Sequence, residues 1–301
     1  MPIVKPERPG GSAESDRPLR ILIVDDQLVV RGALRSALDK LERPILVIEA
    51  GTGEEALGIM QNAQVDVIFC DIQLPGISGP EALAHAYGVA AERPFMVLMS
   101  TRHTSEFRVI GQGIGVYEFL AKPFKAFDVL NAIAAYDRLR RVTRTLLIDD
   151  SATARKLMTR ILGRSQFHIE LHEAASGAEA IRLAHATDFD VIFCDFNMPD
   201  LDGVETAGNL LRLNPAAQIV LISTEQQASM VRSAQFVGAF AFLKKPFDAS
   251  DVDAVLHDAF AIKRPSIAKP THAIFSNEEA VRGRGGAAKA VGKALGGAGV
   301  A

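Results

Sequence analysis

Short apolar segments recur along the chain, and each is followed by polar or turn-forming residues. In the first half of the chain these strand-like segments are Ile21–Val24, Leu46–Glu49, Val67–Cys70, Met96–Met99 and Val116–Leu120. A strand that is apolar throughout is buried on both faces, which is typical of a parallel sheet between two layers of helices. Leu34, Leu38 and Leu41 follow the first segment at helical spacing. The pattern therefore predicts strands and helices in alternation around a parallel sheet.

The whole pattern occurs twice. The pentapeptide VIFCD stands at Val67–Asp71 and again at Val191–Asp195, 124 positions later. The strand-like segments of the second copy are Leu146–Ile148, Val191–Cys194, Ile219–Ile222 and Phe240–Leu243. The tripeptide Lys-Pro-Phe at 122–124 recurs at 245–247, so the offset shortens by one residue on the way. A repeat of this length indicates a duplicated domain and not the short units of a solenoid.

The repeat divides the chain into four parts. We expect an N-terminal arm over residues 1–18, a first domain over 19–141, a second domain over 142–262 and a tail over 263–301. Each domain is predicted to be α/β, with five parallel strands in a doubly wound sheet. A short linker, Val142–Arg144, is expected to join them. Because both ends of the chain are polar or rich in Pro, Gly and Ala, we expect them to be flexible and mostly disordered.

Composition narrows the class of protein. No apolar run approaches the roughly 18 residues of a membrane-spanning helix, so no membrane span is expected. Residues 1–18 lack the apolar region of a secretory signal, and we expect a cytoplasmic protein. The net charge of −3 gives no general basic excess for nucleic acid. Two cysteines, Cys70 and Cys194, cannot form a disulfide framework and are expected to be buried core residues.

Acidic residues fall at the predicted carboxyl ends of neighbouring strands. They are Asp25, Asp26 and Asp71 in the first copy, and Asp149, Asp150 and Asp195 in the second. In a doubly wound sheet the first and third strands are adjacent, so these carboxylates converge. Carboxylates this close repel one another unless a cation lies among them, and Mg²⁺ prefers oxygen ligands of this kind. We therefore expect one Mg²⁺ ion in each domain.

A hydroxyl and a lysine complete the set in each copy. Ser100 and Ser223 follow the fourth strand, and Lys122 and Lys245 follow the fifth. A lysine, a hydroxyl and a metal ion can together hold the three peripheral oxygens of a phosphoryl group on the central carboxylate. The pattern favours an aspartate that accepts a phosphoryl group and has its own metal ion and anion-binding groups.

Each copy resembles the receiver domain of two-component response regulators, a flavodoxin-like (βα)5 fold, over residues 19–141 and 144–262. The resemblance rests on the Asp-Asp pair, the Asp-x-x-x-Pro loops at 71–75 and 195–199, the serine and the Lys-Pro-Phe tripeptide. One of these motifs alone is weak evidence. All of them in the same order, twice, each after an apolar strand, are a strong signal.

The resemblance implies a role for each residue of the motifs. Asp71 and Asp195 would accept the phosphoryl group, and Lys122, Lys245, Ser100 and Ser223 would contact it. The metal ligands would be Asp25, Asp26, Asp71 and the backbone carbonyl of Gln73 in the first copy, and Asp149, Asp150, Asp195 and the backbone carbonyl of Asn197 in the second.

The resemblance also implies a conformational switch. Phe119 and Phe242 stand three residues before each lysine, where the family has an aromatic switch residue. Thr101 and Thr224 follow the two serines, where the family usually has Ala or Gly. The bulkier threonines would restrict access to the aspartate and slow the turnover of its phosphoryl group.

The function that the resemblance implies is that of a phosphorelay response regulator. Each copy would take its phosphoryl group from a phosphohistidine of a sensor histidine kinase or a histidine phosphotransfer protein. Self-phosphorylation and slow self-dephosphorylation would be its only reactions, so we do not expect an enzyme. Phosphorylation would change a surface made of the fourth helix, fifth strand and fifth helix, where a downstream protein or a second copy would bind.

Other functions stay open. The 39 residues after the second copy are too few and too rich in Gly for a DNA-binding or nucleotide-hydrolysing domain, so no direct sequence-specific DNA binding is expected. The output would then lie on a partner chain, as for a regulatory subunit of an enzyme or transcription factor, or the protein would be a phosphate sink. A metal-dependent phosphohydrolase is a further alternative, and it would turn over small phosphate esters at catalytic rates. A flavin protein is disfavoured because Asp25-Asp26 stand where a phosphate would need to bind.

Overall fold

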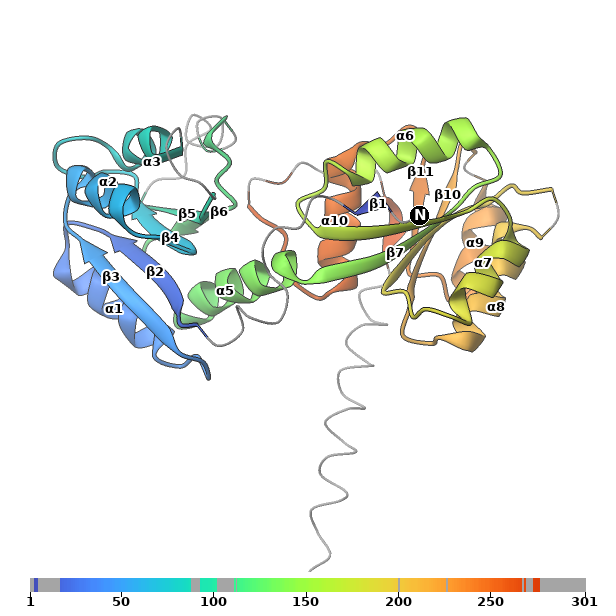
Figure 1. Cartoon of the computed structure of the whole chain (residues 1–301), viewed down its shortest axis with the longest axis horizontal. Helices are drawn as coiled ribbons and strands as arrows, with labels where there is room; N and C mark the ends of the chain where they lie inside the picture. Colours follow the sequence, from blue (N-terminus) through green and yellow to red (C-terminus); the bar gives the residue numbers. More distant parts are fainter. Residues whose placement is uncertain are drawn as a thin grey trace, which may run out of the picture. The chain divides into compact units, whose positions relative to one another are not determined.

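The computed structural model describes residues 3–4, 17–87, 93–101, 111, 113–199, 201–225, 227–266, 268 and 273–276. These fall into two compact units, each with its own sheet (Figure 1). The units divide between Asp137 and Arg138, so the boundary lies a few residues before the predicted one. We describe each unit by itself, as the first and the second domain.

The first domain contains the predicted five-stranded parallel sheet. Its strands are β2 (Leu19–Val24), β3 (Ile45–Ala50), β4 (Val67–Asp71), β5 (Phe95–Ser100) and β6 (Glu118–Ala121). The order across the sheet is β3-β2-β4-β5-β6, and every neighbouring pair is parallel. Its helices are α1 (Leu28–Leu38), α2 (Gly53–Asn62), α3 (Gly79–Tyr87) and α5 (Ala126–Arg140). Residues 102–110, within the region where the fourth helix is expected, lie outside the described residues.

Helices cover both faces of this sheet because its central strands are apolar on both. On one face, Leu34 of α1 and Ile133 of α5 pack against Ile21 and Phe69. On the other, residues of α2 and α3 pack against the alternate positions of the same strands, Leu22 and Ile68 among them. The side chains of β4 are buried from Val67 to Asp71. The sheet therefore forms the middle of three layers, as the apolar segments predict.

The second domain repeats the same sheet. Its parallel strands are β7 (Val142–Ile148), β8 (His168–Ala174), β9 (Val191–Asp195), β10 (Gln218–Ser223) and β11 (Ala241–Lys244). Its helices are α6 (Ala152–Leu162), α7 (Gly177–Ala184), α8 (Gly203–Leu213), α9 (Ala228–Val237) and α10 (Ala249–Ala259). The order β8-β7-β9-β10-β11 matches that of the first domain strand for strand. The fold class predicted from the duplicated pattern is thus confirmed.

The predicted linker over Val142–Arg144 is wrong, because these residues belong to β7. That strand pairs with β8 from Val142 opposite His168 onwards. The side chains of Thr143 and Thr145 are fully buried, and β-branched residues fit a half-buried pleated surface. The polar residues at the start of the second copy resemble a linker in the sequence, but they form the first part of β7.

Two short strands extend the second sheet beyond its five parallel strands, and we predicted neither. β1 (Ile3–Val4) pairs antiparallel with β8, and β12 (Ala273–Ser276) pairs antiparallel with β11. These segments correct the expectation of unstructured ends at 3–4 and 273–276. Each is a brief apolar run inside a polar or Gly-rich stretch, so the composition averaged over the arm or tail hides it. The rest of both ends lies mainly outside the described residues.

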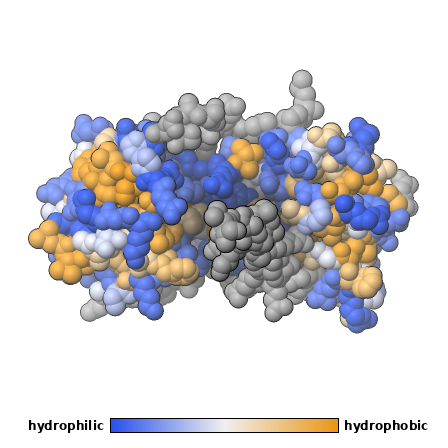
Figure 2. Space-filling model, turned by 90° about the horizontal axis from the view of Figure 1, so that it is seen from below, coloured by the Kyte–Doolittle hydropathy of each residue, from blue (hydrophilic) through white to orange (hydrophobic). Residues whose placement is uncertain are grey.

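Some large apolar side chains stay exposed in both domains. They are Leu28, Val29, Leu46, Phe127, Val142, Leu157, Leu213 and Phe236. Figure 2 shows hydrophobic patches among hydrophilic residues on one face of the molecule. Within the part of the chain that the structure describes, no helix combines the length and apolar character that crossing a membrane requires.

Candidate functional site

The carboxyl end of the first sheet brings together Asp25, Asp71 and Lys122. Asp25 follows β2, Asp71 ends β4 and Lys122 follows β6. The Nζ atom of Lys122 lies 2.5 Å from Oδ2 of Asp25 and 2.7 Å from Oδ2 of Asp71. Asp25 is fully buried and Asp71 is 6% exposed. Residues 97 positions apart in the sequence thus form one buried ionic cluster, as their places at the strand ends predict.

Asp26 adds a third carboxylate on the solvent side of this cluster. One ligand atom from each of Asp25, Asp26 and Asp71 lies within 4.8 Å of the others. Asp25 and Asp71 are buried, whereas Asp26 is exposed. A single lysine cannot neutralise three carboxylates, and hard oxygen ligands on one open side suit a Mg²⁺ ion that keeps several waters. The residues present therefore fit a magnesium site.

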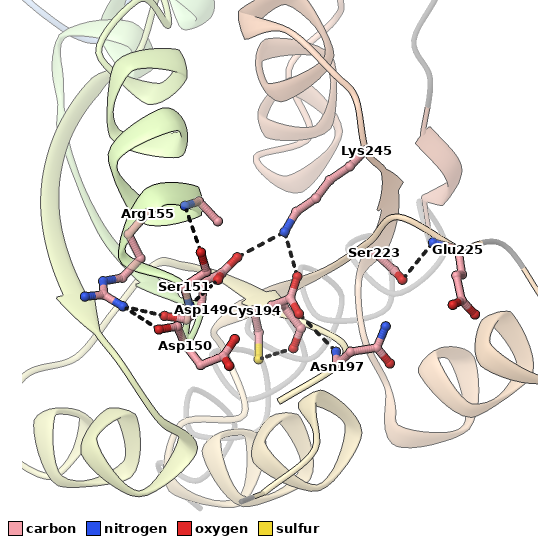
Figure 3. A network of polar contacts seen from close by, with 11 residues as sticks. Asp149, Asp150, Ser151, Arg155, Cys194, Asn197, Ser223, Glu225 and Lys245 are labelled. Carbon is pink, nitrogen blue, oxygen red and sulfur yellow. Dashed lines mark hydrogen bonds and ion pairs between the residues drawn. The ribbon is translucent and has the colours of Figure 1, made fainter. Parts of the chain in front are cut away.

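The second domain repeats the lysine cluster (Figure 3). Nζ of Lys245 lies 3.0 Å from Oδ2 of Asp149 and 2.7 Å from Oδ1 of Asp195. Asp149 is 3% exposed. Asp150 is exposed beside it, as Asp26 is in the first domain. Among the described residues, however, only the trio of the first domain has its ligand atoms close enough to form a ready metal site.

Burial and neighbouring charges shift the pKa values in both clusters in the same way. Burial raises the pKa of Asp71 and of Asp195, and this outweighs the opposing effect of the lysine beside each. Burial alone would lower the pKa of Lys122 and Lys245, but their hydrogen bonds to the aspartates outweigh it and raise the pKa of both lysines. The lysines are therefore held in the charged form between the carboxylates.

The loops after Asp71 and Asp195 orient both carboxylates. The backbone N–H of Gln73 donates to Oδ1 of Asp71 at 3.4 Å, and that of Asn197 donates to Oδ2 of Asp195 at 3.1 Å. Each of these hydrogen bonds fixes one carboxylate oxygen of the aspartate against the backbone of the loop that follows it. The carbonyls of Gln73 and Asn197 as metal ligands remain a prediction from the resemblance.

The two serines lie at the strand ends where the sequence predicts them, and the two threonines follow directly after. Ser100 ends β5 and Ser223 ends β10, and both are buried. The Oγ atom of Ser223 accepts a hydrogen bond from the backbone N–H of Glu225 at 3.1 Å. Thr101 and Thr224 are exposed beside the serines.

Both predicted switch residues point into the core. Phe119 is 6% exposed and Phe242 is fully buried. The rings of Phe242 and Phe196 lie 6.1 Å apart, between centroids. A Cβ atom on Gly111 would approach the ring of Phe119 to 2.7 Å, so this ring fills the space beside that glycine. This geometry does not test whether Phe119 and Phe242 act as switches, so that role remains a prediction.

The two cysteines are buried core residues, as expected. Cys70 and Cys194 are fully buried, one residue before each central aspartate. Burial raises the pKa of both thiols, with a further contribution from the neighbouring aspartates. Each thiol donates a weak hydrogen bond to the carbonyl of the aspartate that follows it. They are inert packing residues and not nucleophiles.

An arginine that contacts the backbone of each aspartate cluster was missed in the sequence analysis. Arg31 donates to the backbone carbonyl of Asp25 and forms an ion pair with Glu49. Arg155 does the same with Asp149 and Glu173 (Figure 3 labels Arg155). The signal was present, since Arg31 and Arg155 are related by the same offset of 124 residues as the acids.

Two glycines were also missed. A Cβ atom on Gly79 would lie 2.0 Å from the carbonyl oxygen of Asp71, and one on Gly203 would lie 2.3 Å from that of Asp195. Each glycine begins the helix after the central aspartate, α3 or α8. Only a residue without a side chain lets these helices begin so close to the aspartate.

A family model described as the response regulator receiver domain matches residues 21–134 and 145–257. The chain therefore belongs to the response regulator receiver domain family, with one receiver in each matched range. We call these the first and second receivers. Receivers of this family are signalling modules that bind Mg²⁺ at an acidic pocket and interact with histidine kinases or phosphotransfer proteins.

Individual relatives match one receiver at a time. The chemotaxis protein CheY of Listeria monocytogenes is 31% identical over 116 residues, which is 38% of this chain and 97% of that protein. CheY of Bacillus subtilis is 33% identical over 109 residues, covering 36% of this chain and 90% of its own. The response regulator MprA of Mycolicibacterium vanbaalenii is 31% identical over 47% of this chain and 58% of its own.

One solved structure spans both receivers. It is described as a two-component system response regulator/GGDEF domain protein, and it covers 81% of this chain and 98% of its own. The TM-score is 0.57 and the sequence identity is 22%. At this identity the likeness shows the fold alone.

Proposed function

We propose that this protein is a phosphorelay response regulator in which both receivers accept a phosphoryl group, the first on Asp71 and the second on Asp195. The observation that carries the proposal is the repeated contact between one lysine and two strand-end aspartates. Lys122 bridges Asp25 and Asp71, and Lys245 bridges Asp149 and Asp195. Neither lysine has been lost from the duplicated pattern, so neither receiver lacks the group that would hold a phosphoryl oxygen.

The chemistry is the transfer of a phosphoryl group to a carboxylate oxygen of the central aspartate. A carboxylate oxygen of Asp71 or Asp195 attacks the phosphorus of a phosphohistidine, a P–O bond forms and the P–N bond breaks. The electron pair of that bond stays on the imidazole of the donor. The backbone N–H of Gln73 or Asn197 holds one carboxylate oxygen in place, and Lys122 or Lys245 contacts the other. The attacking oxygen must therefore exchange its lysine contact for the bond to phosphorus, and the lysine then pairs with a phosphoryl oxygen.

The remaining groups stabilise the negative charge of the transferred group. Lys122 or Lys245 pairs with one phosphoryl oxygen, and Ser100 or Ser223 donates to another. A Mg²⁺ ion held by Asp25, Asp26 and Asp71, or by Asp149, Asp150 and Asp195, would neutralise charge on the phosphoryl oxygens. The carbonyls of Gln73 and Asn197 would complete its protein ligands.

The donor is a sensor histidine kinase or a histidine phosphotransfer protein, and the output is a change in protein binding. Phe119 and Phe242 would turn when Ser100 and Ser223 bind the phosphoryl group. The protein acts in the cytoplasm without a catalytic activity on other substrates. A second copy or a downstream protein would bind the surface around the fifth strand of a receiver.

Phosphoryl uptake tests the proposal directly. With Mg²⁺ and acetyl phosphate, intact-mass measurement should show two added phosphoryl groups per chain. Asp71→Asn and Asp195→Asn should each remove one group, and the double variant should take up none. Asp39→Asn, an exposed aspartate of the same chain, is the matched control and should keep both. Phosphoryl groups that persist in the double variant would overturn the proposal.

A further inference from the structure

The two receivers differ at one edge of their sheets. In the second receiver β12 pairs antiparallel with β11, with Phe275 opposite Phe242 and Ser276 opposite Ala241. In the first receiver the equivalent strand is β6, and among the described residues no strand pairs with its outer edge. Ser266 donates hydrogen bonds from its backbone N–H and its hydroxyl to the carboxylate of Glu118 on β6. Within the described residues, the edge of β11 is thus covered by a strand and that of β6 is not.

The covered strand is joined directly to the phosphoryl site. β11 is four residues long and ends at Lys244, so Lys245 follows it at once. The backbone N–H of Lys245 donates to the carbonyl of Ser223, and its Nζ contacts Asp195. A shift of Lys245 towards a phosphoryl oxygen would therefore move the end of β11, the strand that carries Phe242.

The pairing between β12 and β11 is short and irregular. β12 is a four-residue strand on the sheet edge, and its register is irregular between Phe242 and Leu243. Each backbone hydrogen bond contributes little net free energy, so a strand held by so few of them is only marginally stable. It also contacts α10, so it lies against the strand and the helix that form part of the expected output surface.

We propose that the outer edge of β11 is the strand-binding site of the second receiver, that β12 occupies it within the same chain, and that phosphorylation of Asp195 releases β12. This inference rests on the proposed function of Asp195. While β12 is bound, the edge of β11 is closed to other strands. Once it leaves, the unpaired edge is open to the edge strand of a second copy of this chain.

Thermodynamic linkage makes the proposal reciprocal. If phosphorylation of Asp195 weakens the binding of β12, then loss of β12 must favour phosphorylation of Asp195 by the same factor. The first receiver provides an internal control, because Asp71 lies in an equivalent site and no strand among the described residues pairs with β6 as β12 pairs with β11.

Hydrogen exchange of the full chain tests the release. With Mg²⁺ and acetyl phosphate, backbone amides of 241–244 and 273–276 should exchange about tenfold faster than without the phosphoryl donor. Asp195→Asn should abolish this change and Asp71→Asn should keep it. Phosphoryl groups are counted by mass in the same samples. If Asp195 is phosphorylated and the protection is unchanged, this inference fails while the proposed function stands. If Asp195 takes up no phosphoryl group, both fail.

A proline in β12 tests the reciprocal effect. Phe275→Pro removes a backbone donor and disfavours the strand, and the matched control Ala288→Pro lies in the Gly/Ala-rich stretch beyond it. Phe275→Pro should expose 241–244 to exchange without phosphorylation and raise the steady-state phosphorylation of Asp195 about tenfold at limiting donor. The phosphorylation of Asp71 should not change. Sedimentation should show dimers of Phe275→Pro where the control is monomeric. Equal phosphorylation of Asp195 in both variants, or an unchanged monomer, would overturn the inference.

Discussion

Lys122 and Lys245 occupy equivalent places in the two receivers, but their side chains differ in solvent exposure. The side chain of Lys122 is 8% exposed, and that of Lys245 is 23% exposed. The contact between Lys245 and Asp149 is also longer, at 3.0 Å against 2.5 Å for Lys122 and Asp25. Because charges interact more strongly where water is excluded, the same set of residues gives a tighter ionic cluster in the first receiver.

The sheet edges differ in the opposite direction. β11 of the second receiver is covered by β12, whereas β6 of the first receiver has no strand on its outer edge in the part that the structure describes. The first receiver therefore has the more closed site and the more open edge. The two receivers keep the same aspartates and lysine, and they differ in the burial of the lysine and in the cover of the sheet edge.

The largest expected difference concerns the two lysines. Lys122→Met leaves the buried carboxylates of Asp25 and Asp71 without their cation, which costs the first receiver about 3–5 kcal/mol of unfolding free energy in the absence of Mg²⁺. Lys245→Met costs the second receiver about 1–2 kcal/mol, because its partly exposed cluster is screened by water. The chain has no Trp, so unfolding cannot be followed by tryptophan fluorescence. It is measured for each receiver by hydrogen exchange of peptides from β4 and β9 across a denaturant series.

Two exposed lysines provide the controls for this comparison. Lys40→Met in the first receiver and Lys156→Met in the second should leave both unfolding free energies within about 0.5 kcal/mol of the parent. Equal losses for Lys122→Met and Lys245→Met would show that the difference in burial has no energetic consequence.

The second receiver should be the more sensitive to acid because of His257. This residue of α10 is 1% exposed, and burial lowers the pKa of its imidazole from 6.5 to about 4. The equivalent residue of the first receiver is Ala134. Since the unfolded chain takes up the proton first, stability is complete above pH 6.5 and is lost as pH falls towards 4. The loss reaches about 3 kcal/mol for the second receiver.

A histidine substitution isolates this effect from the carboxylates. His257→Gln should flatten the decline in stability of the second receiver between pH 6.5 and 4, measured by hydrogen exchange of β9 peptides. His185→Gln, at an exposed position, should leave the decline unchanged. An equal decline in the His257→Gln variant and the parent would contradict the assignment.

The glycines after the central aspartates should behave alike in both receivers. Gly79→Ala and Gly203→Ala each place a Cβ atom against the carbonyl of the aspartate, and each should cost about 1–3 kcal/mol through forced backbone shifts. Phosphoryl uptake at the affected aspartate should slow as well. Gly58→Ala is the matched control, because nothing lies within 4 Å of its Cβ position, and it should stabilise α2 by about 0.5–1 kcal/mol. A large loss at only one of Gly79 and Gly203 would show that the duplicated helices no longer approach the aspartates equally.

The sequence predicted the sheets and both lysine clusters because these follow from periodicity and strand ends. Val67–Asp71 and Val191–Asp195 are apolar and repeated, and parallel strands place their carboxyl ends on one edge. β12 could not be predicted, because its four residues are stabilised by contacts with β11 and α10, which are not its neighbours in the sequence. The unequal burial of Lys122 and Lys245 was hidden for a related reason: it depends on side chains from several elements, which no repeat pattern specifies.

The smallest expected difference concerns Mg²⁺. Because the ligand atoms of Asp25, Asp26 and Asp71 already lie within 4.8 Å of one another, the first receiver has less rearrangement to make on binding than the second. We expect two classes of site in calorimetric titration of the full chain, with the first receiver about tenfold tighter, or about 1.4 kcal/mol. Asp26→Asn should remove the tighter class and Asp150→Asn the weaker one. Asp39→Asn, exposed on the same domain, should keep both. Two equal sites in the parent chain would mean that Asp149, Asp150 and Asp195 close around the ion at no cost, so that the spacing of the carboxylates without the ion does not set the affinity.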